Sequence, residues 1–457
     1  MPSNQPVFRM IAAIALAVGA RSTCRGEDLS EAWRIAVSVD QRLEATRHSA
    51  EAAGHDLKSS KAARLPQIQT VNTPTFLTNS IIPSTAAAGG AGKGGGTNNM
   101  FMLSAVAGTV PLYTGGRILN TIDQNRAEVN AARAEETSTT LDLKFDVAQA
   151  YIGVLRTGRS VAVARSNVVS LAAQTRDVDN LVKNGRGIRN DLLAARTALA
   201  NARQREIQVR NNLDLAWATY NRYLCRPMNT VVPLEDLAVN LVRAMPLPTE
   251  DEALKLETDP TAERAAPVNE PELRRLIDVA FRNRSELAGL SEQARAQFSQ
   301  SAAERAATRP QASFIVANIY QNTRILPVQD FGVASFLVAW TPFDGGRSRQ
   351  RALATERRGA ATKSRQADLA ASIALEVRSA WLNLDETRRR IPVTRSAIEQ
   401  AEENLRVARS RYIQQRGTNT EVLDAETLRI QSYDNYYNAL YDSILADFRL
   451  RRAIGEL

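Results

Sequence analysis

The stretch VPLYTGGR at residues 110–117 returns as TPFDGGR at residues 341–347, at an offset of 230 to 231 residues. In both copies an aromatic residue stands shortly before Gly-Gly-Arg, and the arginine begins a long stretch with helical character. Two further matches keep the same register: Ala150-Tyr151 with Ala380-Trp381, and Gly187 with Gly417. The sequence therefore contains two copies of one structural plan.

Each copy continues into a very long predicted helix. Arg117 to Gly187, and again Arg347 to Gly417, span 70 residues. At 1.5 Å per residue such a helix is about 105 Å long, which no compact domain accommodates. Apolar and small residues recur at alternating spacings of three and four, as in coiled coils. These residues are Val168, Leu171, Thr175, Val178 and Val182 in the first copy, and Ile398, Ala401, Leu405, Ala408 and Tyr412 in the second.

Two β-like runs precede each long helix: residues 67–77 and 101–113 in the first copy, and 312–320 and 331–340 in the second. Each pair predicts a hairpin, so one chain offers four strands. Four strands cannot close a barrel, and an open sheet edge in lipid leaves backbone groups unpaired. Three chains would supply twelve strands, which lies in the known range of outer-membrane barrels. The predicted fold is mainly α with a membrane β-barrel: a long α-helical barrel, a coiled-coil tunnel, plus four β-strands per chain, shared in a homotrimeric twelve-stranded barrel.

Four segments follow from these patterns. Residues 1–26 are predicted to be a signal peptide and N-terminal segment, because Arg9 precedes an apolar run at 10–18 and small residues at 18–20. Residues 27–225 form the first repeat, 226–270 a proline-rich connector and 271–457 the second repeat. Lipidation of Cys24 stays open, since Arg21, Ser22 and Thr23 precede it. Residues 85–99, nearly all Ala, Gly, Thr and Asn, predict a surface loop.

The composition argues against several classes of function. The 457 residues include 58 Lys+Arg and 49 Asp+Glu, for a net charge of +9. Acids are interspersed among the basic residues, so no dedicated nucleic-acid surface is predicted. Two cysteines and two histidines cannot build a disulfide framework or a structural zinc site. No catalytic constellation or nucleotide loop is evident, so we expect neither an enzyme nor a cofactor.

With these features, the sequence resembles the TolC-type outer-membrane efflux protein family over nearly the whole mature chain. The resemblance implies a homotrimer in the outer membrane with a long periplasmic portion. It also implies a passive exit duct of a tripartite efflux or type I secretion system, opened by a periplasmic adaptor and an inner-membrane pump or ABC exporter. Its partners would be those proteins and outer-membrane lipid. The alternative is a structural coiled-coil protein of the cell envelope without transport activity.

The resemblance also implies which residues form the periplasmic entrance. Glu421 and Asp424 match the acidic residues that line the constriction, and Asp191 and Tyr412 match a pair that holds the entrance closed. Gly417 stands where the family places an arginine, so that lock is either missing or supplied by another group such as Arg416. In the purely structural alternative, Glu421 and Asp424 only begin the return helix, where acids favour the helix dipole.

Two further groups of residues come from the same resemblance and from the repeated motif. The adaptor is expected to dock at the helix tips, on Gly185, Gly187, Leu192, Gly417, Val422 and Leu423. The junction between barrel and helices is expected at Pro111, Gly115, Gly116, Arg117, Pro342, Gly345, Gly346 and Arg347.

Overall fold

The structure is a computed structural model that describes residues 26–76, 100–238, 270–321 and 330–457. The chain divides into two units. The helical unit comprises Met1–Asp40, Leu141–Leu276 and Val377–Leu457, and the sheet unit comprises Gln41–Thr140 and Ile277–Glu376. The predicted signal peptide with Cys24, the loop at 85–99 and most of the connector lie outside the described residues.

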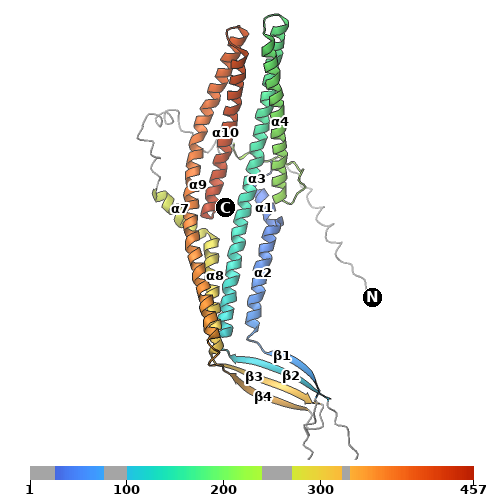
Figure 1. The fold of residues 1–457 in the computed structure, drawn as a ribbon, viewed down its shortest axis with the longest axis vertical. Helices are drawn as coiled ribbons and strands as arrows, with labels where there is room; N and C mark the ends of the chain where they lie inside the picture. Colours follow the sequence, from blue (N-terminus) through green and yellow to red (C-terminus); the bar gives the residue numbers. More distant parts are fainter. Residues whose placement is uncertain (1–25, 77–99, 239–269, 322–329) are drawn as a thin grey trace, which may run out of the picture. The chain divides into compact units, whose positions relative to one another are not determined.

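The sheet unit contains one four-stranded antiparallel sheet in the order β1-β2-β3-β4 (Figure 1). The strands are β1 (Gln67–Phe76), β2 (Met100–Tyr113), β3 (Gln311–Gln321) and β4 (Asp330–Ala339). They confirm the two predicted hairpins to within a few residues. The pairing of β2 with β3, for example Ala107 opposite Ala317, joins the two repeats in one sheet. Within the described chain, β1 and β4 are the edge strands, each with one neighbour.

The helices of the sheet unit are α2 (Gln41–Ala62), α8 (Ser285–Arg305), the 3₁₀ turn η2 (Ala306–Thr308) and the first parts of α3 (Arg117–Lys183) and α9 (Arg347–Ile413). The helix α7 (Glu270–Asn283) leads into α8. Polar contacts fix α8 against α9: Ser301 donates to the Ala352 carbonyl at 2.8 Å, and Arg284 pairs with Glu376 at 3.1 Å. Small residues keep the two helices close, since a Cβ on Gly359 would lie 3.1 Å from the Phe298 ring.

The repeated Gly-Gly-Arg motif forms the junction between sheet and helix, as predicted. Gly115 and Gly116, and their counterparts Gly345 and Gly346, all have positive φ between 63° and 90°. This conformation favours glycine and turns the chain from strand into helix. Pro111 lies where the β2–β3 register shifts, and Pro342 follows the end of β4. At the start of α9, hydrogen bonds from Ser348 lower the pKa of Asp344, which also accepts from the Gly346 amide at 3.0 Å.

The helical unit contains two long helical hairpins, α3 with α4 (Arg189–Tyr223) and α9 with α10 (Asn419–Ile454), together with α1 (Leu29–Val39) (Figure 1). Both α3 and α9 are 67 residues long and begin at the predicted arginines. The predicted spacing marks the packed face, since Leu171, Val178, Leu405, Ala408 and Tyr412 are all buried. Coiled-coil periodicity therefore identified the core of this unit correctly.

Residues 226–238 of the connector pack against the N-terminal segment of the same unit. Glu27 forms a bridge to Leu234, and its buried carboxylate pairs with Arg226 at 2.8 Å. The hydroxyl of Tyr151 donates to the carbonyls of Glu27 and Glu235 at 2.8 and 2.7 Å. Tyr151, which the internal repeat singles out, is thus a core residue that fastens the N-terminal segment to α3. Among the described helices, none is long and apolar enough to cross a membrane.

Candidate functional site

The turns at the ends of α3 and α9 use the same geometry with different residues. Positive φ falls on Gly185 (70°) in the first repeat and on Gln415 (59°) in the second. Gly187 and Gly417, which mark the ends of the two predicted long helices, have ordinary φ instead. A Cβ on Gly187 would lie 2.9 Å from the Val182 nitrogen, and one on Gly417 would lie 3.1 Å from the Arg411 Cβ. These two glycines are therefore needed for close chain approach.

The second turn begins α10 with a capping box. The Thr418 hydroxyl accepts from the Glu421 amide at 3.3 Å and donates to the Glu421 carboxylate at 3.2 Å. The first of these bonds satisfies one of the amides that the first helical turn leaves open. Glu421 and Asp424 are both exposed. Glu421 therefore has a structural role, and its carboxylate remains accessible to solvent and ions.

Asp191 and Tyr412 meet across the two hairpins. Tyr412 is only 8% exposed in the core formed by Val178, Leu192, Ala195, Leu405 and other residues of the tips. Burial raises the pKa of the Tyr412 phenol, and the charge of Asp191 and a side-chain hydrogen bond to it raise the pKa further. The phenol therefore stays protonated at neutral pH and donates to Asp191. The contact joins α4 of the first hairpin to α9 of the second.

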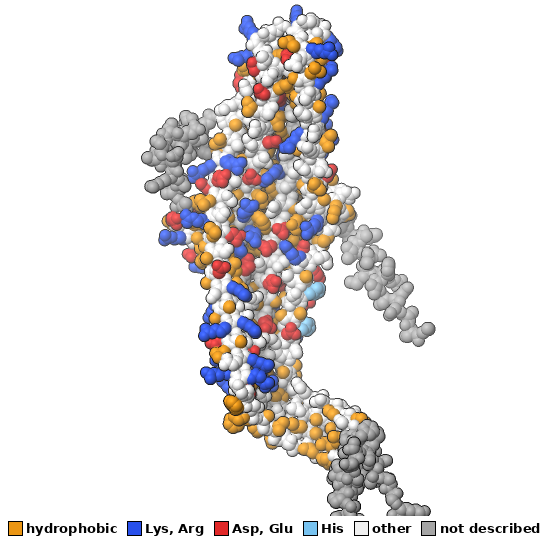
Figure 2. Space-filling view, viewed as in Figure 1, with side chains coloured by type: hydrophobic (Ala, Val, Ile, Leu, Met, Phe, Trp, Pro, Cys, Tyr) orange, Lys and Arg blue, Asp and Glu red, His pale blue; other side chains and the backbone are white. Residues whose placement is uncertain are grey.

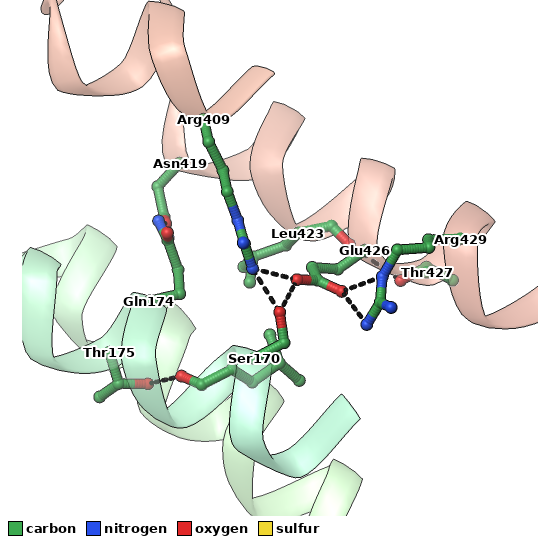
Figure 3. A network of polar contacts seen from close by, with 10 residues as sticks. Ser170, Gln174, Thr175, Arg409, Asn419, Leu423, Glu426, Thr427 and Arg429 are labelled. Atoms are coloured by element: carbon green, nitrogen blue, oxygen red, sulfur yellow. Dashed lines mark hydrogen bonds and ion pairs between the residues drawn. The ribbon is translucent and has the colours of Figure 1, made fainter. Parts of the chain in front are cut away.

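A buried charged network lies next to this pair (Figure 3). The carboxylate of Glu426 on α10 is 2% exposed and is paired with Arg409 of α9 and Arg429 of α10. Ser170 of α3 also donates to Glu426, and Arg409 contacts the same hydroxyl. Three donors from three helices therefore converge on one carboxylate. Such an arrangement compensates the cost of burying its charge.

Neutral polar side chains extend the network toward the turns. Gln174 of α3 donates to the Asn419 side chain at 3.2 Å, and Asn419 donates to the Asp191 carbonyl at 3.1 Å. Both Gln174 and Asn419 are buried. The bond from Gln174 to Asn419 and the bond from Asn419 to Asp191 both run between the α3–α4 hairpin and the α9–α10 hairpin. The two hairpins are consequently held together at their tips by polar bonds as well as by apolar packing.

The chain has recognisable relatives in sequence and in fold. Residues 35–224 match the family model described as outer membrane efflux protein. Among solved structures, the fold matches the outer membrane protein VceC of Vibrio cholerae with a TM-score of 0.74 at 15% identity, covering 93% of this chain and 96% of that one. Residues 35–224 therefore carry the sequence pattern of the outer membrane efflux protein family. The Campylobacter jejuni outer membrane channel CmeC matches with a TM-score of 0.75 at 12% identity, covering 100% of this chain and 93% of CmeC.

A membrane protein from Pseudomonas aeruginosa matches this chain with a TM-score of 0.75 at 18% identity, covering 93% of this chain and 92% of that one. Among curated proteins, no sequence match was found. The solved structures establish the fold across both repeats, including the second repeat that the family model does not reach.

Two residues that we expected at the adaptor surface lie elsewhere. Val422 is 0% exposed and Leu192 is 8% exposed, and both belong to the apolar core of the tips. They cannot contact a partner in this conformation. The exposed apolar residues near the turns are instead Ile188 (67%), Leu193 (52%) and Ile413 (65%). Gly185, Gly187, Gly417 and Leu423 keep their expected places at or beside the turns.

The sequence reasoning missed the Glu426 network, because Glu426 and Arg409 look like ordinary surface charges. A signal was nevertheless present: Asn419, Val422, Glu426, Arg429 and Tyr433 step by three and four along α10. A carboxylate in such a seam position faces the partner helix, where polar residues specify register. Within the described residues, no ion pair joins Arg416 to Asp191. Arg409 is the arginine that takes part in cross-linking the tips.

Two grooves flank the network on the helical unit. One, of about 680 Å³, is lined by residues of α3, α9 and α10, including Ser170, Arg409 and Arg429. The other, of about 670 Å³, is lined by residues of α3, α4 and α10, including Leu171, Ala202 and Leu423. Glu426 borders the second groove, and its three partners Ser170, Arg409 and Arg429 border the first. A ligand in either groove would therefore contact the groups that hold the hairpins together. Within the described residues, there is no His, Cys, Asp and Glu cluster that could hold a metal ion.

Proposed function

We propose that this chain is a member of the outer membrane efflux protein family and forms an outer-membrane exit duct, a passive channel from the periplasm to the exterior that works with a periplasmic adaptor and an inner-membrane pump or ABC exporter. The observation that carries this proposal is the joint occurrence of the four-stranded sheet and two 67-residue helices in a chain with the family's fold. The family is one of channel proteins, which also supports a function without bond chemistry.

The open edges of the sheet supply the physical reason for assembly. Strands of 10 to 14 residues are long enough to cross the hydrocarbon core of a bilayer. In lipid, the edge groups of β1 and β4 must find partners. Pairing β1 of one copy with β4 of the next satisfies them, and three copies close a twelve-stranded barrel. A homotrimer is therefore the proposed assembly.

The proposed entrance lies at the tips of the helical unit. Three copies would bring the exposed carboxylates of Glu421 and Asp424 around one axis, where they attract cations. The hydrogen bond between Tyr412 and Asp191 would hold the two hairpins of each copy in a closed arrangement. Opening the duct then requires breaking the bonds that join α3 and α4 to α9 and α10.

The entrance acids can be neutralised without disturbing the fold. The double variant Glu421→Gln with Asp424→Asn should relieve block of the pore by divalent cations and leave assembly unchanged. Glutamine serves in the capping box as well as glutamate does. Single-channel recordings with increasing Mg²⁺ measure the block. Thr418→Ala is the matched control, because it removes the cap but no charge; if it relieved block as strongly as the double variant, the acids would not be the cation site.

The Asp191–Tyr412 contact predicts a second change in gating. Tyr412→Phe removes the donor and keeps the ring in its core position, so the resting conductance should rise. Hydrogen bonds to charged acceptors contribute about 1.5–3 kcal/mol, which corresponds to tenfold or more in the closing equilibrium. Adding Asp191→Asn to the Tyr412→Phe variant should change little more, because both changes remove the same contact. Full additivity of the two effects in single-channel recordings would show that the residues act separately.

The adaptor is proposed to dock at the tips and grooves of the helical unit. The exposed residues Ile188, Leu193 and Ile413 offer apolar contacts beside the two turns. An adaptor bound in either groove would lie next to Glu426 or its partners, which line the two grooves. Docking there would compete with the bonds between the hairpins, which links adaptor binding to opening of the entrance.

Planar-bilayer recording tests the function itself. Purified protein should insert and give discrete conductance steps, and cell fractionation should recover it with outer membranes. A structural coiled-coil protein of the envelope would account for the long helices but would show no conductance. Recovery in the cytosol, or insertion without current steps, would overturn the proposal of an exit duct.

A further inference from the structure

We propose that the helix-facing end of the sheet binds the phosphate headgroups of anionic phospholipids, with the start of α9 supplying the principal cations. This inference rests on the proposed outer-membrane location. It adds a specific lipid contact to that location. Arginines, a cavity beside the sheet and an apolar surface next to it all lie at this end.

An arginine stands at the helix-facing end of every strand. Arg64 precedes β1, Arg117 follows β2, Arg309 precedes β3 and Arg347 follows β4. Because the strands are antiparallel, these four positions all lie at one end of the sheet. Two of the arginines also fasten the junction: Arg309 donates to the Gly115 carbonyl at 3.0 Å and Arg117 to Gln311 at 3.4 Å.

The start of α9 concentrates positive charge where helix electrostatics disfavour it. Arg347, Arg349 and Arg351 are exposed and occupy three of the first five positions, and the first turn contains no acid. The amino end of a helix carries partial positive charge, so cations there are unfavourable. From Arg347 to Arg365 the helix has seven basic residues and one acid, Glu356, which is paired with Arg305. A local arrangement that lowers helix stability in this way is expected where the charges serve binding.

A cavity of about 540 Å³ joins this charge to an apolar wall. Arg305 and Arg349 line it together with Pro342, Phe343 and Leu353. Asp344 also lines it, but its carboxylate accepts the Gly346 and Ser348 amides at 3.0 and 2.9 Å. Within the described ranges no ion pair involves Arg349. The cavity therefore combines a guanidinium with apolar surface, as a headgroup phosphate and the first carbons of its acyl chains require.

Large apolar residues continue from the cavity onto the sheet. Phe343 is 81% exposed and Trp340 is 61% exposed, and the Trp340 ring nitrogen donates to the carbonyl of Thr308, which lines the same cavity. Tyr113 at the end of β2 is 55% exposed. Figure 2 shows Lys and Arg side chains gathered over the helices next to the sheet, and hydrophobic side chains over the sheet itself. Aromatic residues mark the edges of the apolar band in membrane proteins, so the arginines lie at headgroup level.

Quenching of tryptophan fluorescence by brominated lipids tests this contact, because the ring of Trp340 is hydrogen-bonded to Thr308, which lines the cavity. The full-length protein is placed in phosphatidylcholine bilayers that contain increasing amounts of either brominated phosphatidylglycerol or brominated phosphatidylcholine. A Trp340→Phe variant supplies the background from Trp33, Trp217 and Trp381. Juxtamembrane cations each favour anionic lipid. We expect Trp340 to prefer phosphatidylglycerol by roughly tenfold or more.

Three charge variants identify the cause of the preference. The triple change Arg347→Gln, Arg349→Gln, Arg351→Gln should abolish it, and the corresponding triple change to lysine should retain it. A control triple variant removes the same number of charges from exposed positions of the helical unit, by Arg165→Gln, Arg203→Gln and Arg395→Gln. It should leave the preference for phosphatidylglycerol unchanged.

Each outcome decides the inference. Equal quenching of the wild-type protein by both lipids would overturn it and leave the exit duct standing. An unchanged preference in the glutamine variant would also overturn it, as would loss in the lysine variant. Failure of the wild-type protein to enter either bilayer would overturn the exit duct and this inference together.

Discussion

Replacing Glu426 with alanine is expected to loosen the tips of the helical unit, with amide exchange in α10 and the adjoining part of α9 accelerated on the order of 100-fold. The physical reason is the buried charge that remains. Glu426 neutralises Arg409 and Arg429, and Arg429 is only 13% exposed. Removing one member of a buried ion pair typically costs about 3–5 kcal/mol, because the partner stays buried without compensation.

The measurement is local hydrogen–deuterium exchange by mass spectrometry, which reports opening of the tips without requiring global unfolding. Glu403→Ala is the matched control, since Glu403 and Arg406 form an exposed pair on α9. That variant should change exchange by no more than about threefold. Combining Glu426→Ala with Arg409→Met should cost less than the sum of the single changes. Exchange at wild-type rates in Glu426→Ala would show that the network does not hold the hairpins together.

Loosening the tips should also alter the channel. If the hairpins must separate for the duct to open, Glu426→Ala should raise the resting conductance beyond the effect of Tyr412→Phe. Faster amide exchange in Glu426→Ala without any rise in resting conductance would show that the network stabilises the tips but does not control gating.

Replacing Gly115 with alanine should lower the free energy of unfolding by about 2–4 kcal/mol, whereas Gly345→Ala should cost only about 1–2 kcal/mol. The two glycines occupy the same place in the two repeats and have similar φ values of 63° and 71°. Their surroundings differ. A Cβ on Gly115 would lie 2.6 Å from the Arg309 Cβ, while one on Gly345 would meet nothing within 4 Å.

Left-handed backbone conformation therefore contributes equally to both variants, and the difference between them measures the clash at the first junction. Thermal denaturation of the purified protein in detergent gives the comparison, with assembly checked at low temperature. An equal decrease in the free energy of unfolding in both variants would mean that the residues around Gly115 can shift to accommodate the added Cβ at little energetic cost. A larger loss at Gly345 would contradict the packing described for both junctions.

The fold was largely predictable because its signals repeat. The Gly-Gly-Arg motif requires positive φ in both copies, and the long helices carry one periodic seam each, so every element was indicated twice. The turns at the tips were less predictable. Gln415 adopts the conformation that Gly185 adopts in the first repeat, and a glutamine gives no sign of it in the sequence. Gly417, the visible glycine, is instead required for close packing.

The candidate site was predictable only in part. Asp191 and Tyr412 were paired through the family resemblance, and the structure brings them into contact. Glu426 was missed because burial of a charged residue depends on which helices face each other, and periodicity along one helix does not reveal its neighbour. For the same reason Val422 and Leu192 were placed at the surface although they fill the core. The contacts between the two hairpins are therefore the feature of the site that could not be predicted from the sequence alone.

The central claim is that one chain is a third of a closed duct. The most direct measurement is the mass of the detergent-solubilised particle by native mass spectrometry, followed by its structure by electron cryomicroscopy. The account predicts a particle of three chains in which β1 of one copy pairs with β4 of the next around a continuous lumen. A stable single-chain particle, or three chains without a shared sheet, would contradict it.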